Sequence, residues 1–200
     1  MAVPGLEERL DALLPQTFCR QCGFDGCRAY ARAMAEGRAL PNRCAPGGDA
    51  GAAALAQVLG VPGLPLDPEY GREMPFAVAR IRPAECIGCA RCRKACPVDA
   101  VTGGPKRLHA VIEAACSGCA LCVDACPVGA IEMKEAGREW TRDDAIRSHS
   151  RHEARARRIE RERREEEALY ETLGSGSALE RRKAAVDAIL ALAAKLGKKP

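Results

Sequence analysis

The chain has 200 residues and a formal net charge of +4, with 12 cysteines and an aromatic content of only 4%. A charge this small is weak evidence for a nucleic-acid partner. The first residues are acidic where a secretory signal needs positive charge, and no segment approaches the roughly 18–20 apolar residues that span a bilayer. We therefore expect a cytoplasmic protein, in which clustered cysteines are metal ligands more often than disulfides.

The first segment contains four cysteines spaced C-x2-C-x4-C-x16-C, namely Cys19, Cys22, Cys27 and Cys44. We expect Cys27 to begin a helix, "CRAYARAMAEG", because the positive end of the helix dipole favours a thiolate. Cys44 lies beyond that helix, just before Pro46. Four such ligands can hold one [4Fe-4S] cluster, but the spacing alone leaves a zinc site open.

A helix, a linker and three short strands are predicted around the remaining cysteines. Asp49 is expected to cap an Ala/Leu-rich helix that ends near Gly60, and the Pro/Gly-rich "VPGLPLDP" that follows is typical of an extended linker. The stretches "PFAVARI", "LHAVIE" and "AIEMKE" have the composition of strands. We expect the ends of this region to pair as small antiparallel hairpins.

One twelve-residue pattern occurs twice, as "CIGCARCRKACP" at 86–97 and "CSGCALCVDACP" at 116–127. Its spacing, C-x2-C-x2-C-x3-C-P, is typical of proteins with two iron–sulfur clusters. Three cysteines at steps of three can surround one cube, and Gly88 and Gly118 allow the backbone to approach it. In this pattern the fourth cysteine, before Pro97 or Pro127, ligates the other cluster.

The predicted ligand sets are therefore crossed between the two copies. One cluster would be held by Cys86, Cys89, Cys92 and Cys126, and the other by Cys96, Cys116, Cys119 and Cys122. Zinc is the alternative, but zinc sites usually consist of two C-x2-C pairs with a longer spacer between them. Three oxidised clusters, each with four thiolates, would add about −6 to the formal charge of +4, leaving about −2.

The composition changes after Arg138. The stretch "RHEARARRIERERREEEALYETL" is almost wholly charged, with Arg and Glu at i,i+3 and i,i+4, and it predicts a solvated helix. "GSGS" at 174–177 indicates a flexible break before a second, amphipathic helix. We expect Trp140 to anchor this tail against the cluster-binding part. The spacing of the histidines is unlike that of metal ligands, so we expect all three at the surface: His109, His149 and His152.

The stretches "LPQTFCRQCGFDGCRAYARAM" and "NRCAPGGDA", together with the two repeats, resemble the B subunit of Rnf-type electron transport complexes, also called ion-translocating oxidoreductase complexes. The resemblance covers about 13–134 and includes all 12 cysteines. It implies three [4Fe-4S] clusters and an electron relay between ferredoxin-type or nicotinamide-linked partners and a membrane ion pump. Family members usually begin with a membrane-spanning helix. We find none before the first cysteine motif, and so expect a soluble, ferredoxin-like variant.

We accordingly expect an α+β fold of three parts. These are a small N-terminal [4Fe-4S] cluster domain (1–60), a two-cluster bacterial ferredoxin domain (76–137) after a linker (61–75), and a helical C-terminal tail (138–200). The expected function is one-electron transfer through three [4Fe-4S] clusters, as the B subunit of an Rnf-type complex or as a related soluble ferredoxin. No residue is expected to be catalytic, so the chain is an electron carrier rather than an enzyme by itself.

Redox proteins are the expected partners: reductases, ferredoxins or the membrane subunits of an Rnf-type complex. We expect no nucleic acid to bind. We expect the chain in the cytoplasm, either free or peripherally attached to the cytoplasmic face of the inner membrane. The alternative function is a cysteine-rich interaction module that is stabilised by zinc or associated with nucleic acid through the Arg-rich helix.

Overall fold

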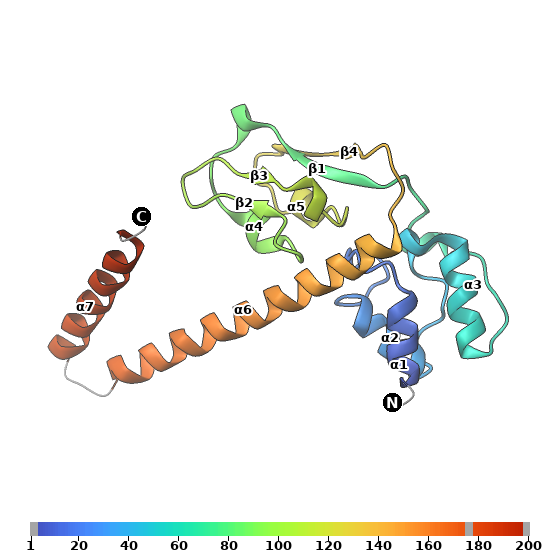
Figure 1. Ribbon diagram of the computed structural model, residues 1–200, viewed down its shortest axis with the longest axis horizontal. Helices are drawn as coiled ribbons and strands as arrows, with labels where there is room; N and C mark the ends of the chain where they lie inside the picture. Colours follow the sequence, from blue (N-terminus) through green and yellow to red (C-terminus); the bar gives the residue numbers. More distant parts are fainter. Residues whose placement is uncertain (1–3, 175–177, 198–200) are drawn as a thin grey trace. The chain divides into compact units, whose positions relative to one another are not determined.

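The computed structural model describes residues 4–174 and 178–197, which belong to two compact units, Met1–Glu153 and Ala154–Pro200. The first unit contains every cysteine and mixes short helices with short strands (Figure 1). The second is helical throughout its described part. The expected mixture of helices and strands with a helical tail is therefore confirmed. The division between the units lies inside helix α6 (Arg142–Gly174).

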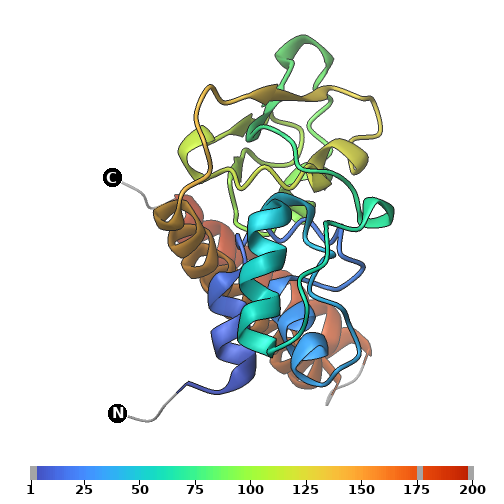
Figure 2. The same cartoon turned by 90° about the vertical axis from the view of Figure 1, so that its right-hand side faces the viewer.

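Three helices form the N-terminal segment, 4–60. They are α1 (Leu6–Leu13), α2 (Cys27–Ala35) and α3 (Gly48–Leu59), and α1 packs against both of the others (Figure 2). A single-turn helix, η1 (Ala45–Gly47), directly follows Cys44, and a second one, η2 (Pro68–Tyr70), lies inside the linker. A small apolar core stabilises the segment, since each large buried side chain contributes about 1.5–3 kcal/mol. Its members include Leu10, Leu14, Tyr30, Met34 and Leu55.

The ends of these helices agree with the sequence except at one point. Helix α2 begins at Cys27, and α3 ends before Gly60, whose left-handed conformation (φ 68°) terminates the helix. The prediction that Asp49 caps α3 is wrong, because the helix already begins at Gly48. The Asp49 carboxylate instead accepts a hydrogen bond from the backbone N–H of Leu66 at 2.7 Å. It therefore holds the linker against the helix.

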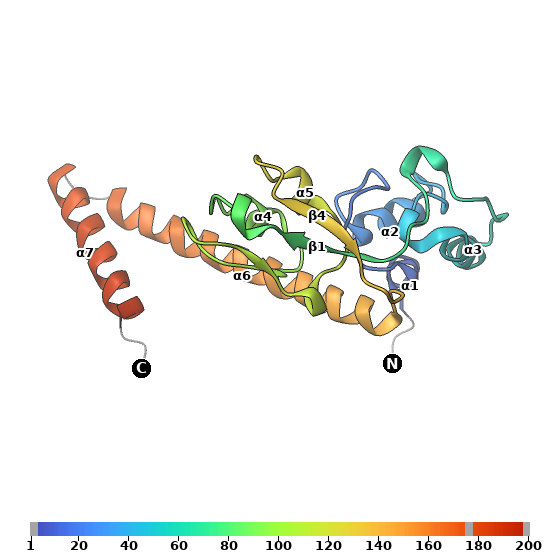
Figure 3. The same ribbon diagram turned by 90° about the horizontal axis from the view of Figure 1, so that it is seen from above.

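The repeat segment, 76–137, contains two small antiparallel sheets. Strand β1 (Ala77–Ile81) pairs with β4 (Ile131–Glu135), so the two ends of the segment lie side by side (Figure 3). Strand β2 (Val101–Thr102) pairs with β3 (Ala110–Val111) in the middle. The three predicted strands are confirmed. The fourth, β2, was not predicted, because two residues are too few to show a periodic pattern.

The sequence of the repeat segment aligns with itself after a shift of 30 residues (86 to 116). In each copy a strand leads through a single 3-10 turn to the first cysteine, and a short helix carries the third. In the first copy these are β1, η3 (Pro83–Glu85) and α4 (Arg91–Ala95). In the second they are β3, η4 (Glu113–Ala115) and α5 (Leu121–Asp124). The repetition in sequence is therefore also a repetition of secondary structure.

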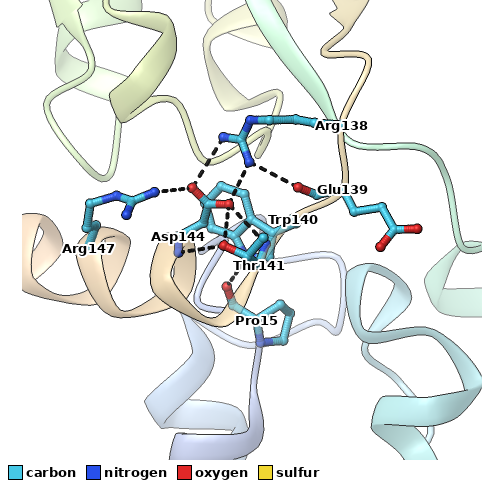
Figure 4. A network of polar contacts seen from close by, with 7 residues as sticks. All are labelled: Pro15, Arg138, Glu139, Trp140, Thr141, Asp144 and Arg147. Atoms are coloured by element: carbon cyan, nitrogen blue, oxygen red, sulfur yellow. Dashed lines mark hydrogen bonds and ion pairs between the residues drawn. The ribbon is translucent and has the colours of Figure 1, made fainter.

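Helix α6 begins with a reciprocal pair of hydrogen bonds (Figure 4). The Asp144 carboxylate accepts from the backbone N–H of Thr141 at 2.9 Å, and the Thr141 hydroxyl accepts from the backbone N–H of Asp144 at 3.3 Å. This capping box satisfies backbone donors at the start of the helix. Trp140, just before it, donates its indole N–H to the Pro15 carbonyl at 2.8 Å. The predicted anchoring by Trp140 is confirmed.

Charged pairs follow the exposed face of α6, as predicted. Glu160 accepts from Arg163 at 2.8 Å and from Arg164 at 2.7 Å. The second helix of the tail is α7 (Ala178–Gly197). Most of the break expected at 174–177 lies outside the described residues. Of the helices within 4–174 and 178–197, none is both long and apolar enough to cross a membrane.

Candidate metal centres

The 12 cysteines gather in three hollows, four to each, and all of them are free thiols. The Cys19 hollow is lined by Cys19, Cys22, Cys27 and Cys44. The Cys86 hollow is lined by Cys86, Cys89, Cys92 and Cys126. The Cys116 hollow is lined by Cys96, Cys116, Cys119 and Cys122. The structure thus brings together the same fours that the spacing indicated. The space not filled by protein atoms, which includes some open solvent, is about 290 Å³ in the Cys19 hollow, 290 Å³ in the Cys86 hollow and 300 Å³ in the Cys116 hollow.

A glycine and a buried tyrosine shape the Cys19 hollow. Gly26 has a φ of 111°, a conformation that favours glycine, and it starts α2 with Cys27 in the first turn. The Tyr30 hydroxyl donates to the Leu40 carbonyl at 2.7 Å and accepts from the backbone N–H of Arg43 at 3.1 Å. Tyr30 therefore ties the returning chain, which carries the fourth cysteine, to the helix that carries the third. Nothing in the sequence around this tyrosine indicated that role.

Glycines also allow the repeat loops to pass close to neighbouring backbone. A Cβ on Gly88 (φ 70°) would lie 2.8 Å from the backbone nitrogen of Arg107. A Cβ on Gly118 (φ 72°) would lie 2.8 Å from the carbonyl oxygen of Ala77. We predicted that these glycines allow an approach to a cluster. The close approach seen in the structure is to the adjoining loop and strand, so the glycines hold the cysteine loops in place.

Backbone N–H groups donate to sulfur at matching places in the two copies. The Cys96 sulfur accepts from Ala100 N–H at 3.2 Å, and the Cys126 sulfur accepts from Ala130 N–H at 3.3 Å. The Cys116 sulfur accepts from a third backbone N–H, on strand β1, at 3.5 Å. Hydrogen bonds of this kind stabilise negative charge on a thiolate. The repeat segment is therefore suited to hold thiolate ligands.

Burial disfavours the charged form of these thiols. Desolvation raises the pKa of Cys27 and of Cys122 to about 12, and that of Cys119 to about 11. Such thiols keep their protons at neutral pH unless a cation stabilises the thiolate. Because cysteine binds metals as the thiolate, filling the hollows must release protons.

The residues present fit an iron–sulfur cluster better than a single ion. Tetrahedral zinc holds its sulfur ligands about 2.3 Å from one point. Within the two described ranges, no three His, Cys, Asp or Glu side chains converge in the manner of such a site. Each hollow instead combines four soft thiols with apolar walls, such as those from Leu14 and Phe18 in the Cys19 hollow. Soft thiolates in an apolar setting suit iron–sulfur clusters.

A histidine lies in the Cys86 hollow. His109 is only 4% exposed, and its Nδ1 is 3.8 Å from the Cys86 sulfur. The prediction that His109 is a surface residue is therefore wrong. It directly precedes β3, and the pairing of β3 with β2 turns it inward. Cys89 of the same hollow is exposed.

A buried hydrogen bond joins the Cys19 and Cys116 hollows. The Ser117 hydroxyl, next to Cys116, donates to the carbonyl of Thr17, two residues before Cys19, at 2.9 Å. The two residues are 100 positions apart in the sequence. The N-terminal segment and the repeat segment are therefore in direct contact at their cysteine loops.

The first turns of α6 hold the same two regions. The Ser148 hydroxyl donates to the Gln16 carbonyl at 2.6 Å. The Arg151 guanidinium donates to the carbonyls of Val98 and Asp99 at 2.8 and 2.9 Å. One helix thus binds the loop before Cys19 and the loop after Cys96. The sequence indicated a solvated helix here and did not reveal these contacts.

Two family models match the chain at its cysteine hollows. A 4Fe-4S dicluster domain model matches residues 79–133, and a model described as a putative Fe-S cluster matches residues 14–46. The first range contains the cysteines of both repeats, and the second contains those of the Cys19 hollow. Both matches favour iron–sulfur clusters over the zinc-stabilised or nucleic-acid-associated module.

Curated relatives match more than half of the chain. The B subunit of the ion-translocating oxidoreductase complex of Stutzerimonas stutzeri (strain A1501) is 58% identical over 132 residues, which are 66% of this chain and 68% of the relative. The chain belongs to the family of ion-translocating oxidoreductase B subunits. The relatives of the same name from Thiobacillus denitrificans and Azoarcus sp. are 52% and 50% identical over 54% of this chain. This chain spans 57% and 59% of the lengths of those two relatives.

Proposed function

We propose that this member of the B-subunit family relays single electrons through three [4Fe-4S] clusters, one in each hollow. The observation that carries the proposal is that each of three hollows is lined by four cysteines, and that each repeat copy contributes its fourth cysteine to the hollow of the other copy. When bound, an iron–sulfur cluster accepts and releases one electron at a time. The chain holds the clusters, limits their contact with water and directs N–H groups to the sulfurs.

The contact between Ser117 and Thr17 supports an order for the relay. It makes the Cys116 hollow the neighbour of the Cys19 hollow. Cys96 and Cys126 connect the Cys116 hollow to the Cys86 hollow, since each follows the first three cysteines of one copy and lines the hollow of the other. We therefore order the clusters from the Cys19 hollow through the Cys116 hollow to the Cys86 hollow.

The surface of the Cys86 hollow suits an acidic redox partner. Beside the exposed Cys89, two apolar residues that line the hollow, Ile87 and Val128, are 61% and 43% exposed. Arg91 and Lys106 are exposed nearby, and the backbone N–H of Lys106 donates to Gly88 in the cysteine loop at 3.0 Å. Cationic side chains next to an exposed apolar surface attract acidic partners to it, and salt screens that attraction. Reduction by an acidic iron–sulfur or flavin protein should therefore slow as ionic strength rises.

The partners we propose are such soluble redox proteins, a ferredoxin or a reductase, together with membrane subunits of an ion-translocating complex. The relatives carry the name of that complex. We propose the cytoplasmic face of the membrane as the place where the chain would meet both kinds of partner. An electron carrier in this position passes electrons on and turns over no substrate itself.

Paired cysteine variants test the ligand sets. Each [4Fe-4S] cluster contributes four irons, so the wild type should hold about twelve after anaerobic reconstitution. Changing Cys86 and Cys126 together to alanine should remove one cluster and leave about eight irons. Changing Cys116 and Cys126 together should remove two clusters and leave about four. Val128→Ala, in the wall of the Cys86 hollow, is the matched control and should retain the full content. About four irons in the first double variant and about eight in the second would refute crossed ligation. Zinc in place of iron in the wild type would refute the proposed function.

A further inference from the structure

The Cys86 and Cys116 hollows are built from equivalent residues of the two copies. A shift of 30 residues (86 to 116) converts the wall of one hollow into the wall of the other. In the Cys86 hollow the apolar wall includes Ile81, Val128, Ala130 and Ile131. In the Cys116 hollow the same positions are Val111, Val98, Ala100 and Val101. The two hollows therefore offer nearly the same apolar surroundings to whatever they hold.

The correspondence between the residues of the two hollows fails at two positions. Ile87 of the Cys86 hollow corresponds to Ser117, whose side chain contacts the Thr17 carbonyl and also the Cys119 sulfur of its own hollow through hydrogen bonds. His109 of the Cys86 hollow corresponds to Ala79. Among the described residues that line the Cys86 hollow, His109 is the one polar side chain apart from the cysteines. The hollows thus differ in their donors to sulfur: the imidazole lies beside Cys86, whereas Cys116 accepts from the Ala79 backbone N–H at 3.5 Å and Cys119 from Ser117.

The position of the imidazole determines which nitrogen carries the proton. Nδ1 is 3.8 Å from the Cys86 sulfur, and Nε2 is buried with no hydrogen-bond partner in the described structure. A thiolate that binds iron has no proton to give, so it can only accept. A proton on Nδ1 pairs that nitrogen with sulfur and leaves Nε2 as an unpaired acceptor, which costs less than the buried unpaired N–H donor of the other tautomer. The imidazole is therefore arranged to donate Nδ1–H to the Cys86 sulfur.

The surrounding backbone leaves a place for this ring. Gly103, at the end of β2, has a φ of 124°, and a Cβ there would lie 2.7 Å from Cδ2 of His109. The pairing of Thr102 with Ala110 fixes the two strands on either side of this contact. The Gly103 carbonyl also accepts from the Arg93 guanidinium at 3.2 Å, which ties the turn to helix α4. Any side chain at position 103 would collide with the ring, so the glycine is needed for His109 to occupy the hollow.

We propose that His109 donates a hydrogen bond to the Cys86 thiolate and thereby raises the reduction potential of the Cys86 cluster. The inference rests on the proposed function, since it assumes a cluster in each hollow. Reduction adds negative charge to the cluster and its sulfurs, and an N–H donor stabilises the reduced form more than the oxidised form. His109 acts through Cys86 and is a positioning residue.

An anaerobic redox titration of the full chain at one fixed pH tests the proposal. Electron paramagnetic resonance monitors the reduction of each cluster during the titration. His109→Leu keeps a similar bulk and removes the donor, and it should move one midpoint potential to a more negative value while the others stay. His109→Asn offers an N–H near the position of Nδ1 and should restore most of the shift. Ile131→Val trims the same hollow without a polar change, to the residue that the twin copy carries, and should shift nothing.

The possible outcomes separate this inference from the proposed function. If His109→Leu retains about twelve irons and all midpoint potentials are unchanged, the inference is refuted while the proposed function stands. If the wild type shows no cubane signal, the proposed function itself fails. If His109→Leu loses its clusters, the wild-type protein labelled with ¹⁵N at histidine is measured instead. The reduced Cys86 cluster of the wild type should show a ¹⁵N coupling that the Cys116 cluster lacks. The absence of this coupling from both clusters would overturn the inference.

Discussion

Replacing the Asp144 carboxylate by an amide, Asp144→Asn, should lower the stability of the first unit by about 2 kcal/mol. The side chain is 3% exposed and accepts from the Arg138 guanidinium at 2.6 Å and from the Thr141 N–H and hydroxyl at 2.9 Å each (Figure 4). Arg147 donates to it as well. Asparagine retains an acceptor for the Thr141 N–H, so only part of the cap, about 1 kcal/mol, is lost. The bonds to the two arginines add about 1 kcal/mol, which is below the usual range for charged groups because both guanidiniums are half exposed to water.

Anaerobic thermal unfolding followed by circular dichroism measures this effect. About 2 kcal/mol corresponds to a fall of roughly 4–8 °C in the melting temperature of a protein of this size. Asp143→Asn is the matched control, because Asp143 lies in the same first turn and is exposed, and the substitution removes the same charge. Equal falls in the two variants, or no fall in Asp144→Asn, would refute the reasoning.

The pH dependence of the difference follows from the direction of the pKa shift. Burial alone would raise the pKa of Asp144, but hydrogen bonds from Arg138 and Thr141 outweigh burial and hold the pKa well below its usual value. A lowered pKa stabilises the fold above the unfolded value of about 3.9 and loses that contribution as the pH falls through the folded value. The difference between wild type and Asp144→Asn should therefore stay constant from about pH 8 to about pH 5. A difference that already disappears near pH 6 would contradict the buried, charged state of Asp144.

Three further outcomes are expected. Gly88→Ala should cost more than the roughly 1–2 kcal/mol of a left-handed residue, because its Cβ would also collide with backbone. Gly104→Ala is its control, since a Cβ there meets nothing within 4 Å, and equal melting temperatures would contradict us. Arg91→Glu with Lys94→Glu should lower the potential of the Cys86 cluster alone, by tens of millivolts at most because salt screens exposed charges; an unchanged redox titration would exclude the effect. Removal of iron by a chelator should unfold residues 1–135, because α4, α5, β2 and β3 have only two to five residues each and cannot persist unsupported. Near-native circular dichroism of the apo-protein would show otherwise.

The grouping of the cysteines was accessible from the sequence because the spacing constrains the chain locally. Three cysteines at steps of three can reach only one common centre, and the repeat pairs Cys96 and Cys126 with the opposite copy. The structure brings the same fours together. The start of α6 could also have been found, because Thr141 and Asp144 have the spacing of a capping box.

The positions of other residues depend on contacts that no local pattern encodes. His109 is buried because two strands of two residues each pair beside it and Gly103 leaves room for its ring. Tyr30 is fixed by carbonyl and N–H groups of residues that return from beyond the helix. Asp49 bonds to the linker rather than to its own helix. Each depends on the path of a distant segment, which hydrophobic periodicity does not describe.

The central claim is that the three hollows hold three [4Fe-4S] clusters, and metal analysis of the anaerobically purified full chain tests it most directly. We predict about twelve irons and about twelve labile sulfides per chain, with negligible zinc. About three zinc ions per chain and no labile sulfide would contradict the claim and indicate tetrahedral four-thiolate sites instead.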